Sequence, residues 1–179
     1  MVHHPKGKSA VRERRSSLFI QNALLVNEAT VHVKNGSYNK AIFLYNQAVE
    51  MNPNDKNALI ARSKCHLLLG DPQKALDDAE AALRLNPKDS SKSKAVYCKA
   101  EALYHLGDFE MSLVFYYRGM RIRPEFGEFR LGVQKAKDAI QNILLFSGLC
   151  VAACNTESIQ LSKTILVISS ILILNDNVT

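Results

Sequence analysis

The feature that most constrains the fold is a set of small residues and prolines that recurs every 34 residues. Glycine, two alanines and a proline occur as Gly36, Ala41, Ala48 and Pro53, and again as Gly70, Ala75, Ala82 and Pro87. A third copy, 37 residues further on, keeps the glycine and the proline as Gly107 and Pro124. A fixed period of this length indicates a repeat architecture, in which each copy is one supersecondary unit stacked on the next.

Each repeated residue type has a role in a pair of helices. Glycine enters the left-handed region without steric cost, so it predicts the end of the first helix. The next residue is polar in every copy and is placed to cap the second helix; these residues are Ser37, Asp71 and Asp108. The alanines are two helical turns apart and allow close packing, and the proline ends the second helix. The third copy has Ser112 and Gly119 at the alanine positions, which are also small.

Apolar residues follow the same plan. Along residues 41–49 they fall at i, i+3, i+4, i+7 and i+8, which is one stripe of an amphipathic helix. Six such helices bury little alone, so they must stack, and the predicted fold is all-α: a superhelix of three helix-turn-helix repeats with a concave groove lined by the first helices. Phe129, Val133, Ala136 and Ile140 share a face after the last repeat, which predicts a capping helix.

We predict four segments. Residues 1–21 form a basic arm and the start of the first helix, and residues 22–124 hold the repeats, at about 22–55, 56–89 and 93–126. The capping helix covers 125–142, and residues 143–179 form an apolar tail outside the repeat fold. Lys6, Lys8, Arg12, Arg14 and Arg15 place much of the chain's +6 charge in the arm.

The tail has a different composition from the repeats. Its only charged residues are Glu157, Lys163 and Asp176. Its two apolar blocks, 143–154 and 164–174, are each shorter than the roughly 20 residues that a membrane-spanning helix needs. The second block has high β-propensity, which is an aggregation hazard if exposed. We expect a read-through or alternative-exon product without a selected function, and keep a weak membrane anchor as the alternative.

The sequence contains no recognisable set of catalytic residues. The sequence shows no nucleophile with a base, no phosphate-binding loop and no metal-ligand spacing among its four cysteines, so we expect no enzyme activity, cofactor or metal. His32, His66 and His105 are dispersed, and Asp77, Asp78 and Glu80 are expected on one exposed helix face. The basic residues lack the interleaved aromatics of a nucleic-acid interface. The N-terminus lacks a secretory signal pattern, which predicts synthesis in the cytosol.

The spacing of these glycines, alanines and prolines resembles the tetratricopeptide-repeat family over residues 22–124. A narrower resemblance lies in residues 61–65, 97–104, 107–110, 113–116, 123–125 and 128–136, which are similar to the tetratricopeptide subunit of the outer dynein arm docking complex. The segment 128–136 is the most specific, because it lies outside the repeat pattern. This resemblance implies a fragment or isoform of a scaffold that helps attach outer dynein arms to the microtubules of the ciliary axoneme.

The family's geometry implies a groove whose lining residues bind protein segments. The residues that project from first helices toward it are Thr30, Lys64, Lys94, Tyr97, Glu101 and Tyr104. Packing between repeats is an equally good role for the two tyrosines. The alternative function is a co-chaperone adaptor that clamps a terminal carboxylate, but the five clamp positions hold Val26, Thr30, Ala61, Lys94 and Cys98, and only the lysine is retained. Protein partners are expected, with no nucleic acid and no small-molecule substrate.

Overall fold

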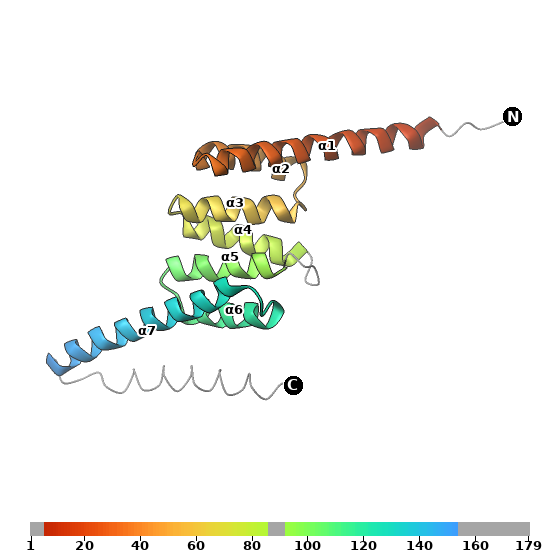
Figure 1. Ribbon diagram of the computed structural model, residues 1–179. Coiled ribbons are helices and arrows are strands. Elements are labelled where there is room, and N and C mark those ends of the chain that lie inside the picture. The colour runs from red at the N-terminus through yellow and green to blue at the C-terminus, as the bar shows by residue number, and fades with distance from the viewer. Residues whose placement is uncertain (1–5, 86–91, 154–179) are drawn as a thin grey trace.

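A computed structural model describes residues 6–85 and 92–153, with the backbone alone for 6–15 and 146–153. These residues form seven helices and no strand: α1 (Lys6–Lys34), α2 (Tyr38–Met51), α3 (Lys56–Leu68), α4 (Pro72–Leu85), α5 (Lys92–His105), α6 (Phe109–Ile122) and α7 (Gly127–Ala153). Successive helices run in opposite directions and stack as pairs, with α7 against α6 (Figure 1). The predicted all-α superhelical repeat fold is confirmed.

The turns between paired helices are built as the repeated glycines predict. Gly36, Gly70 and Gly107 have φ of 73°, 81° and 87°, which is the left-handed region. The residue after each glycine returns its N–H to a carbonyl of the first helix five positions earlier, as in Ser37 N to His32 O at 2.9 Å. The polar caps differ among repeats. Asp108 accepts from Met111 N, whereas Ser37 makes no side-chain cap bond, so its predicted capping role is wrong.

The repeated alanines allow the helices of each pair to pack closely. Ala41, Ala48, Ala75 and Ala82 are all fully buried, as their spacing predicts. In two repeats a serine lies at this contact between the paired helices. Ser63 Oγ donates to Ala75 O at 2.8 Å, and Ser112 Oγ donates to Ala100 O at 2.9 Å. In these two repeats the serine and the alanine have exchanged helices. A small residue is therefore required on both sides of the contact, and a buried hydroxyl is accepted because it finds a carbonyl.

Between α6 and α7, two glycines and two aromatic rings interlock. A Cβ atom on Gly119 would lie 2.0 Å from the ring of Phe129, and one on Gly132 would lie 2.3 Å from the ring of Tyr116. Each helix therefore supplies one glycine that receives a ring from the other, and both rings are fully buried. The resulting cluster includes Val133 and Ala136, so α7 closes the apolar end of the third repeat.

The first and last helices extend beyond the repeats. Residues 6–21 belong to α1, which extends past the end of α2, and α7 continues to Ala153 rather than ending at 142 (Figure 1). Pro87, most of the loop at 88–92 and residues 154–179 lie outside the described residues, and with them most of the expected tail. No helix in the described ranges is long and apolar enough to cross a membrane.

Candidate protein-binding face

The first helices of the repeats lie next to one another, and their shared side carries the predicted binding residues. Thr30 is on α1, Lys64 on α3, and the other four on α5. Thr30, Lys64 and Glu101 occupy one repeat position, because they are separated by 34 and 37 residues. Helix α7 continues this row and adds Lys135 on the same side, next to Glu101. We name the side formed by these residues the first-helix face.

In two of the three repeats, a tyrosine hydroxyl from the second helix contacts the side chain at this repeat position. The Tyr45 hydroxyl lies 3.3 Å from Thr30 Oγ1, and the Tyr116 hydroxyl donates to the Glu101 carboxylate. The second repeat has Ala79 where the other two have the tyrosine. Lys64 receives no such hydroxyl contact, and its side chain is exposed. The middle of the first-helix face therefore presents a lysine amine to solvent.

Glu101 is the most heavily bonded residue of the face. Its carboxylate accepts from Lys135 Nζ at 3.0 and 3.3 Å and from Tyr116. Burial alone raises the pKa of a carboxyl, but these donors and the lysine charge outweigh burial, so the pKa of Glu101 is lowered. Burial, together with this carboxylate, raises the pKa of Tyr116 far above its usual value. Glu101 therefore stays ionised and joins α5, α6 and α7.

Tyr97 and Tyr104 both contribute to packing within the third repeat and against α7. The Tyr97 ring meets Phe126 and Phe129 edge-on, with centroids 5.8 and 5.7 Å apart, so it joins α5 to α7. The Tyr104 ring packs on Phe109 at 5.0 Å, and the Lys135 ammonium lies 4.1 Å from its centroid. A part of each ring remains accessible, since both residues are only partly buried. Rigid aromatic surface of this kind favours protein contacts.

The face carries both signs of charge. Lys64 and Lys94 are exposed, and Glu101 and Lys135 form an ion pair. The sequence prediction missed Lys135 and Tyr116. Lys135 was detectable, because it lies one repeat beyond Glu101, 34 residues along the chain. A face of mixed charge with accessible aromatic edges matches an extended or helical protein segment better than a purely acidic one.

The five clamp positions lack the groups that would bind a terminal carboxylate. Cys98 is fully buried, and burial raises the pKa of its thiol to about 11, so it stays neutral. Val26 and Ala61 are apolar, and Thr30 is engaged with Val26 O and Tyr45. Only Lys94 offers a charged donor at these positions. One ammonium replaces the several charge-assisted donors that such a site needs.

An ionic network joins α3 to α4 and to α2, away from the first-helix face. Arg62 donates to Asp78 at 2.6 and 2.8 Å and to Asn46 at 2.9 Å. Asp78 is buried, so the prediction that it lies on an exposed face is wrong. Because consecutive residues on a helix point about 100° apart, Asp77 stays exposed while Asp78 turns inward. His66 Nε2 lies 3.9 Å from the same carboxylate.

Lys99 occupies the repeat position of Arg62 and makes the equivalent contacts one repeat later. Its ammonium donates to Glu80 at 2.8 Å and lies 4.5 Å from the centroid of the Phe115 ring. Both cations therefore reach back to the second helix of the preceding repeat. Two shallow hollows border α1 at the other end of the stack: one of about 650 Å³ on α1 alone, and one of about 380 Å³ between α1 and α2.

Known proteins resemble the chain in both sequence and structure. The family model described as "Anaphase-promoting complex, cyclosome, subunit 3" matches residues 34–116. A solved structure titled "First TPR of Spaghetti (RPAP3) bound to HSP90 peptide SRMEEVD" aligns with a TM-score of 0.63 at 22% identity, over 68% of this chain and 96% of that one. The chain has the fold of a tetratricopeptide-repeat domain.

Two curated relatives share about half of the aligned residues with this chain. Outer dynein arm-docking complex subunit 4 of Xenopus laevis is 52% identical over 105 residues, and that of Homo sapiens is 48% identical over 107 residues. The alignments cover 59% and 60% of this chain but only 19% and 15% of the relatives. The chain thus spans less than a fifth of the length of these relatives.

Proposed function

We propose that this chain is a non-enzymatic tetratricopeptide-repeat scaffold that takes part in attaching outer dynein arms to the microtubules of the ciliary axoneme. The observation that carries the proposal is the 48–52% identity to outer dynein arm-docking subunits. The axoneme is accordingly the proposed location, and docking-complex proteins are the proposed partners.

The segment 128–136 supports the narrower assignment. It follows the proline that ends the last repeat, and three of its residues have structural roles in this chain: Phe129 fills the space at Gly119, Gly132 receives Tyr116, and Lys135 pairs with Glu101. These contacts attach α7 to the third repeat and complete the first-helix face. A resemblance that includes such positions is more informative than one that falls only on the alanines and glycines common to all such repeats.

The alternative is a co-chaperone or other adaptor that binds a peptide carboxylate on the first-helix face. The similarity in fold to the HSP90-peptide-bound structure is the observation that favours it. The residues at the clamp positions weigh against it, because four of the five lack a suitable donor. We therefore place this function second.

The test is affinity capture from ciliated cells with the tagged full chain, with mass spectrometry of the bound proteins. The matched bait carries Lys64→Glu and Lys94→Glu, which reverse two exposed charges on the first-helix face. Capture of axonemal docking proteins by the chain, weakened by both substitutions, is the expected result. A second sample contains the peptide Ser-Arg-Met-Glu-Glu-Val-Asp as competitor, which should leave this set bound.

One outcome would contradict the proposal, and another would exclude the first-helix face as its site. Recovery of chaperones that the acidic peptide displaces would favour the adaptor function. Recovery of docking proteins to the same extent with the charge-reversed bait would retain the docking assignment but remove the first-helix face as its site.

A further inference from the structure

The outward side of α1 exposes residues whose repeat equivalents are buried. Leu24 and Val31 are 63% and 54% exposed. The residues at the same positions in α3 and α5 are 0% exposed; they are Ala58 and Cys65, and Ala95 and Ala102. All six residues are apolar, so the difference in exposure comes from the neighbouring helices and not from residue type. We name the outward side of α1 its end face; its residues are Ser17, Ile20, Gln21, Leu24, Glu28 and Val31.

In the later repeats these positions are buried by the second helix of the preceding repeat. Ala58 and Cys65 pack in one cluster with Ala41, Tyr45 and Ala48 of α2, and Ala95 packs with Ala79 and Ala82 of α4. Helix α1 uses other sides to contact α2 and α3. In the described part of the chain, the end face has the position of a helix-receiving surface without a helix on it.

Glu28, a polar residue of the end face, also differs from its equivalents in the later repeats, because those equivalents contact a preceding helix. Arg62 and Lys99 each reach back to the preceding second helix, bonding Asn46 and Glu80. Glu28 occupies their position in α1. A helix seated on the end face in the same register would need a basic or hydrogen-bond-donating residue opposite Glu28, where the second helices of this chain carry Asn46 and Glu80.

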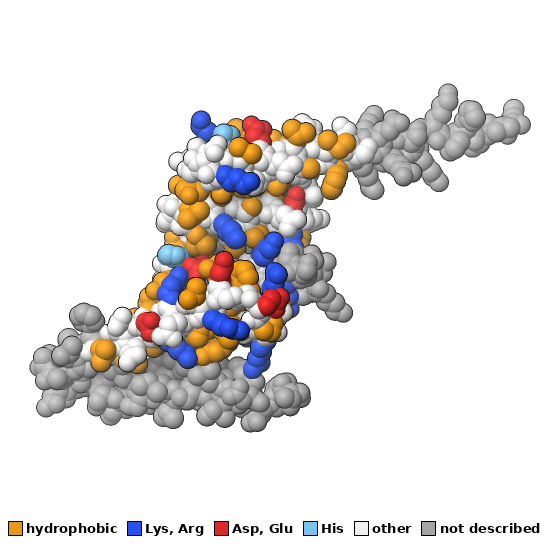
Figure 2. Space-filling model, viewed as in Figure 1, with side chains coloured by type: hydrophobic (Ala, Val, Ile, Leu, Met, Phe, Trp, Pro, Cys, Tyr) orange, Lys and Arg blue, Asp and Glu red, His pale blue; other side chains and the backbone are white. Residues whose placement is uncertain are grey.

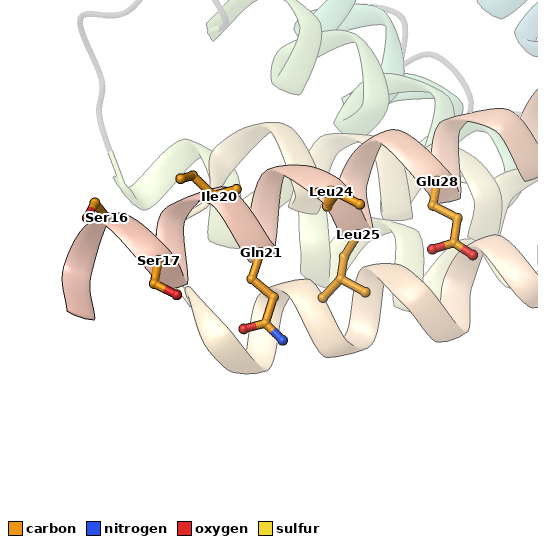
Figure 3. Close-up of a pocket in the computed structure, with 7 residues that line it drawn as sticks. All are labelled: Ser16, Ser17, Ile20, Gln21, Leu24, Leu25 and Glu28. Carbon is orange, nitrogen blue, oxygen red and sulfur yellow. The ribbon is translucent and has the colours of Figure 1, made fainter. Parts of the chain in front are cut away.

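The surface itself is apolar and slightly hollowed. The hollow of about 650 Å³ is lined by residues of α1 alone, among them Ser17, Ile20, Leu24 and Glu28 (Figure 3). Apolar side chains gather on this part of α1 in the space-filling view (Figure 2). Ile20 and Leu24 are one turn apart and Val31 is two turns further, which matches the stripe of a partner helix rather than a flat sheet edge.

Charge indicates which helix fits. The α1 sequence before the stripe has five Lys or Arg and one acid between residues 6 and 15, and Lys34 and Lys40 follow the stripe. A helix docked as the second helices dock runs antiparallel to α1, so the C-terminal end of a helix long enough to span α1 lies beside residues 6–15. Acidic side chains and the negative end of the helix dipole are both favoured there.

We propose that the end face of α1 binds an amphipathic helix from a partner protein, with an apolar stripe on Ile20, Leu24 and Val31 and acidic residues in its C-terminal third. This surface is separate from the first-helix face and does not depend on the ciliary assignment. The occupant takes the place of a preceding second helix. It thereby extends the repeat stack by one helix supplied in trans.

A second copy of the chain fits this surface less well. Antiparallel pairing of two α1 helices through the stripe would set Ile20 near Val31 of the other copy. It would also carry residues 6–15 of each copy past the end of the opposing α1, toward the other copy's Lys34 and Lys40. Basic segments would then meet basic residues at both ends, which disfavours the pair.

The test uses the full chain and two synthetic helical peptides long enough to span residues 6–34. Both peptides carry a Leu/Ala stripe and one arginine at the register of Asn46, and they differ only in having glutamates or lysines in the C-terminal third. Fluorescence anisotropy measures their binding. The glutamate peptide should bind at micromolar concentration and the lysine peptide at least about tenfold more weakly, with the difference reduced by salt.

Variants of the chain locate the site. Leu24→Asp should weaken binding about tenfold or more, because it places a charge inside an apolar contact. Ser17→Glu should weaken the glutamate peptide and Ser17→Lys should strengthen it. Leu131→Asp, which changes an exposed leucine on α7, is the matched control and should have no effect. Circular dichroism checks that each variant remains helical.

Three results would overturn the proposal. These are no saturable binding of the glutamate peptide at millimolar concentration, equal binding of both peptides, or binding unaffected by Leu24→Asp. Analytical ultracentrifugation of the chain alone tests the other occupant. A dimer that Leu24→Asp dissociates would assign the end face to a second copy.

Discussion

Gly119 and Gly132 are required by side-chain contact and not by backbone conformation. Both lie inside helices, and the positive-φ glycines are three others, at the turns. The rings of Phe129 and Tyr116 occupy the space where each Cβ would be. From the sequence alone, Gly119 stands at an alanine position of the repeat and is expected to lower helix stability by about 1 kcal/mol relative to alanine.

Gly119→Ala should therefore destabilise the protein, although alanine is the better helix former. Overpacking a close contact costs about 1–3 kcal/mol, and we expect a net loss of about 1 kcal/mol in the free energy of unfolding. Urea unfolding measures it. Gly127→Ala is the control, since nothing lies within 4 Å of a Cβ there and stability should be unchanged or higher. A higher free energy of unfolding for Gly119→Ala would show that α7 moves aside at little cost.

His66 should make stability depend on pH. Burial lowers its pKa despite the nearby Asp78, and its Nδ1 is a buried atom with no hydrogen-bond partner in the structure. The folded state therefore favours neutral histidine, whereas the unfolded chain takes up a proton near pH 6.5. The contribution of His66 to stability is complete above that pH and is lost as the pH falls through the lowered pKa.

The measurement is the free energy of unfolding at pH 7.5 and at pH 5.5, compared between the protein and His66→Gln. The glutamine variant should lose less stability on acidification, because it cannot be protonated. Equal losses would mean that carboxylates elsewhere in the chain dominate this pH range.

Residues with a backbone role could be predicted from the sequence, and residues with a tertiary role often could not. Gly36, Gly70 and Gly107 were assigned to turns from their spacing, and they have the expected left-handed conformation. Asp78 was misplaced because its burial depends on Arg62 from another helix. Lys135 was missed because its partner Glu101 is 34 residues away, and the capping helix was treated as outside the repeat register. The contacts that define the first-helix face are mainly of this second kind.

At the scale of the element, α7 does more than cover apolar surface. Phe129 seats it on α6, and Lys135 bonds it to α5, so the helix fixes the last part of the first-helix face. Phe129→Ala should destabilise the protein by about 3–5 kcal/mol, since a fully buried ring is removed from between two helices. Hydrogen exchange should show the loss of protection mainly in α7.

Leu131→Ala is the matched control for that experiment, because Leu131 lies on the same helix and is mostly exposed. It should change neither stability nor the exchange pattern by a measurable amount. Uniform loss of protection in all helices of Phe129→Ala would instead indicate that the stack unfolds as one unit.

The beginning of α1 could also have been predicted more closely. Pro5 lies directly before Lys6, where the helix begins, and proline is common at helix starts. The repeat period alone places the start of the first repeat at about residue 22. The period therefore gives the register of a helix but not its length.

At the scale of the whole molecule, the middle of the stack should be its most stable part. Helices α3, α4 and α5 have neighbours on both sides, whereas α1 has its end face open in the described part of the chain. Native-state hydrogen exchange should give the highest protection in α3–α5 and lower values toward α1 and α7. Highest protection in α1 would contradict this and would point to self-association through its end face.

The order of contacts along the stack also has a kinetic consequence. Most helices touch the helix before and the helix after them in the chain, so native contacts join residues close in sequence. Proteins of low contact order lose little loop entropy before their first contacts form, and they fold in about microseconds to milliseconds. Such a body can fold as it leaves the ribosome, one hairpin of helices at a time.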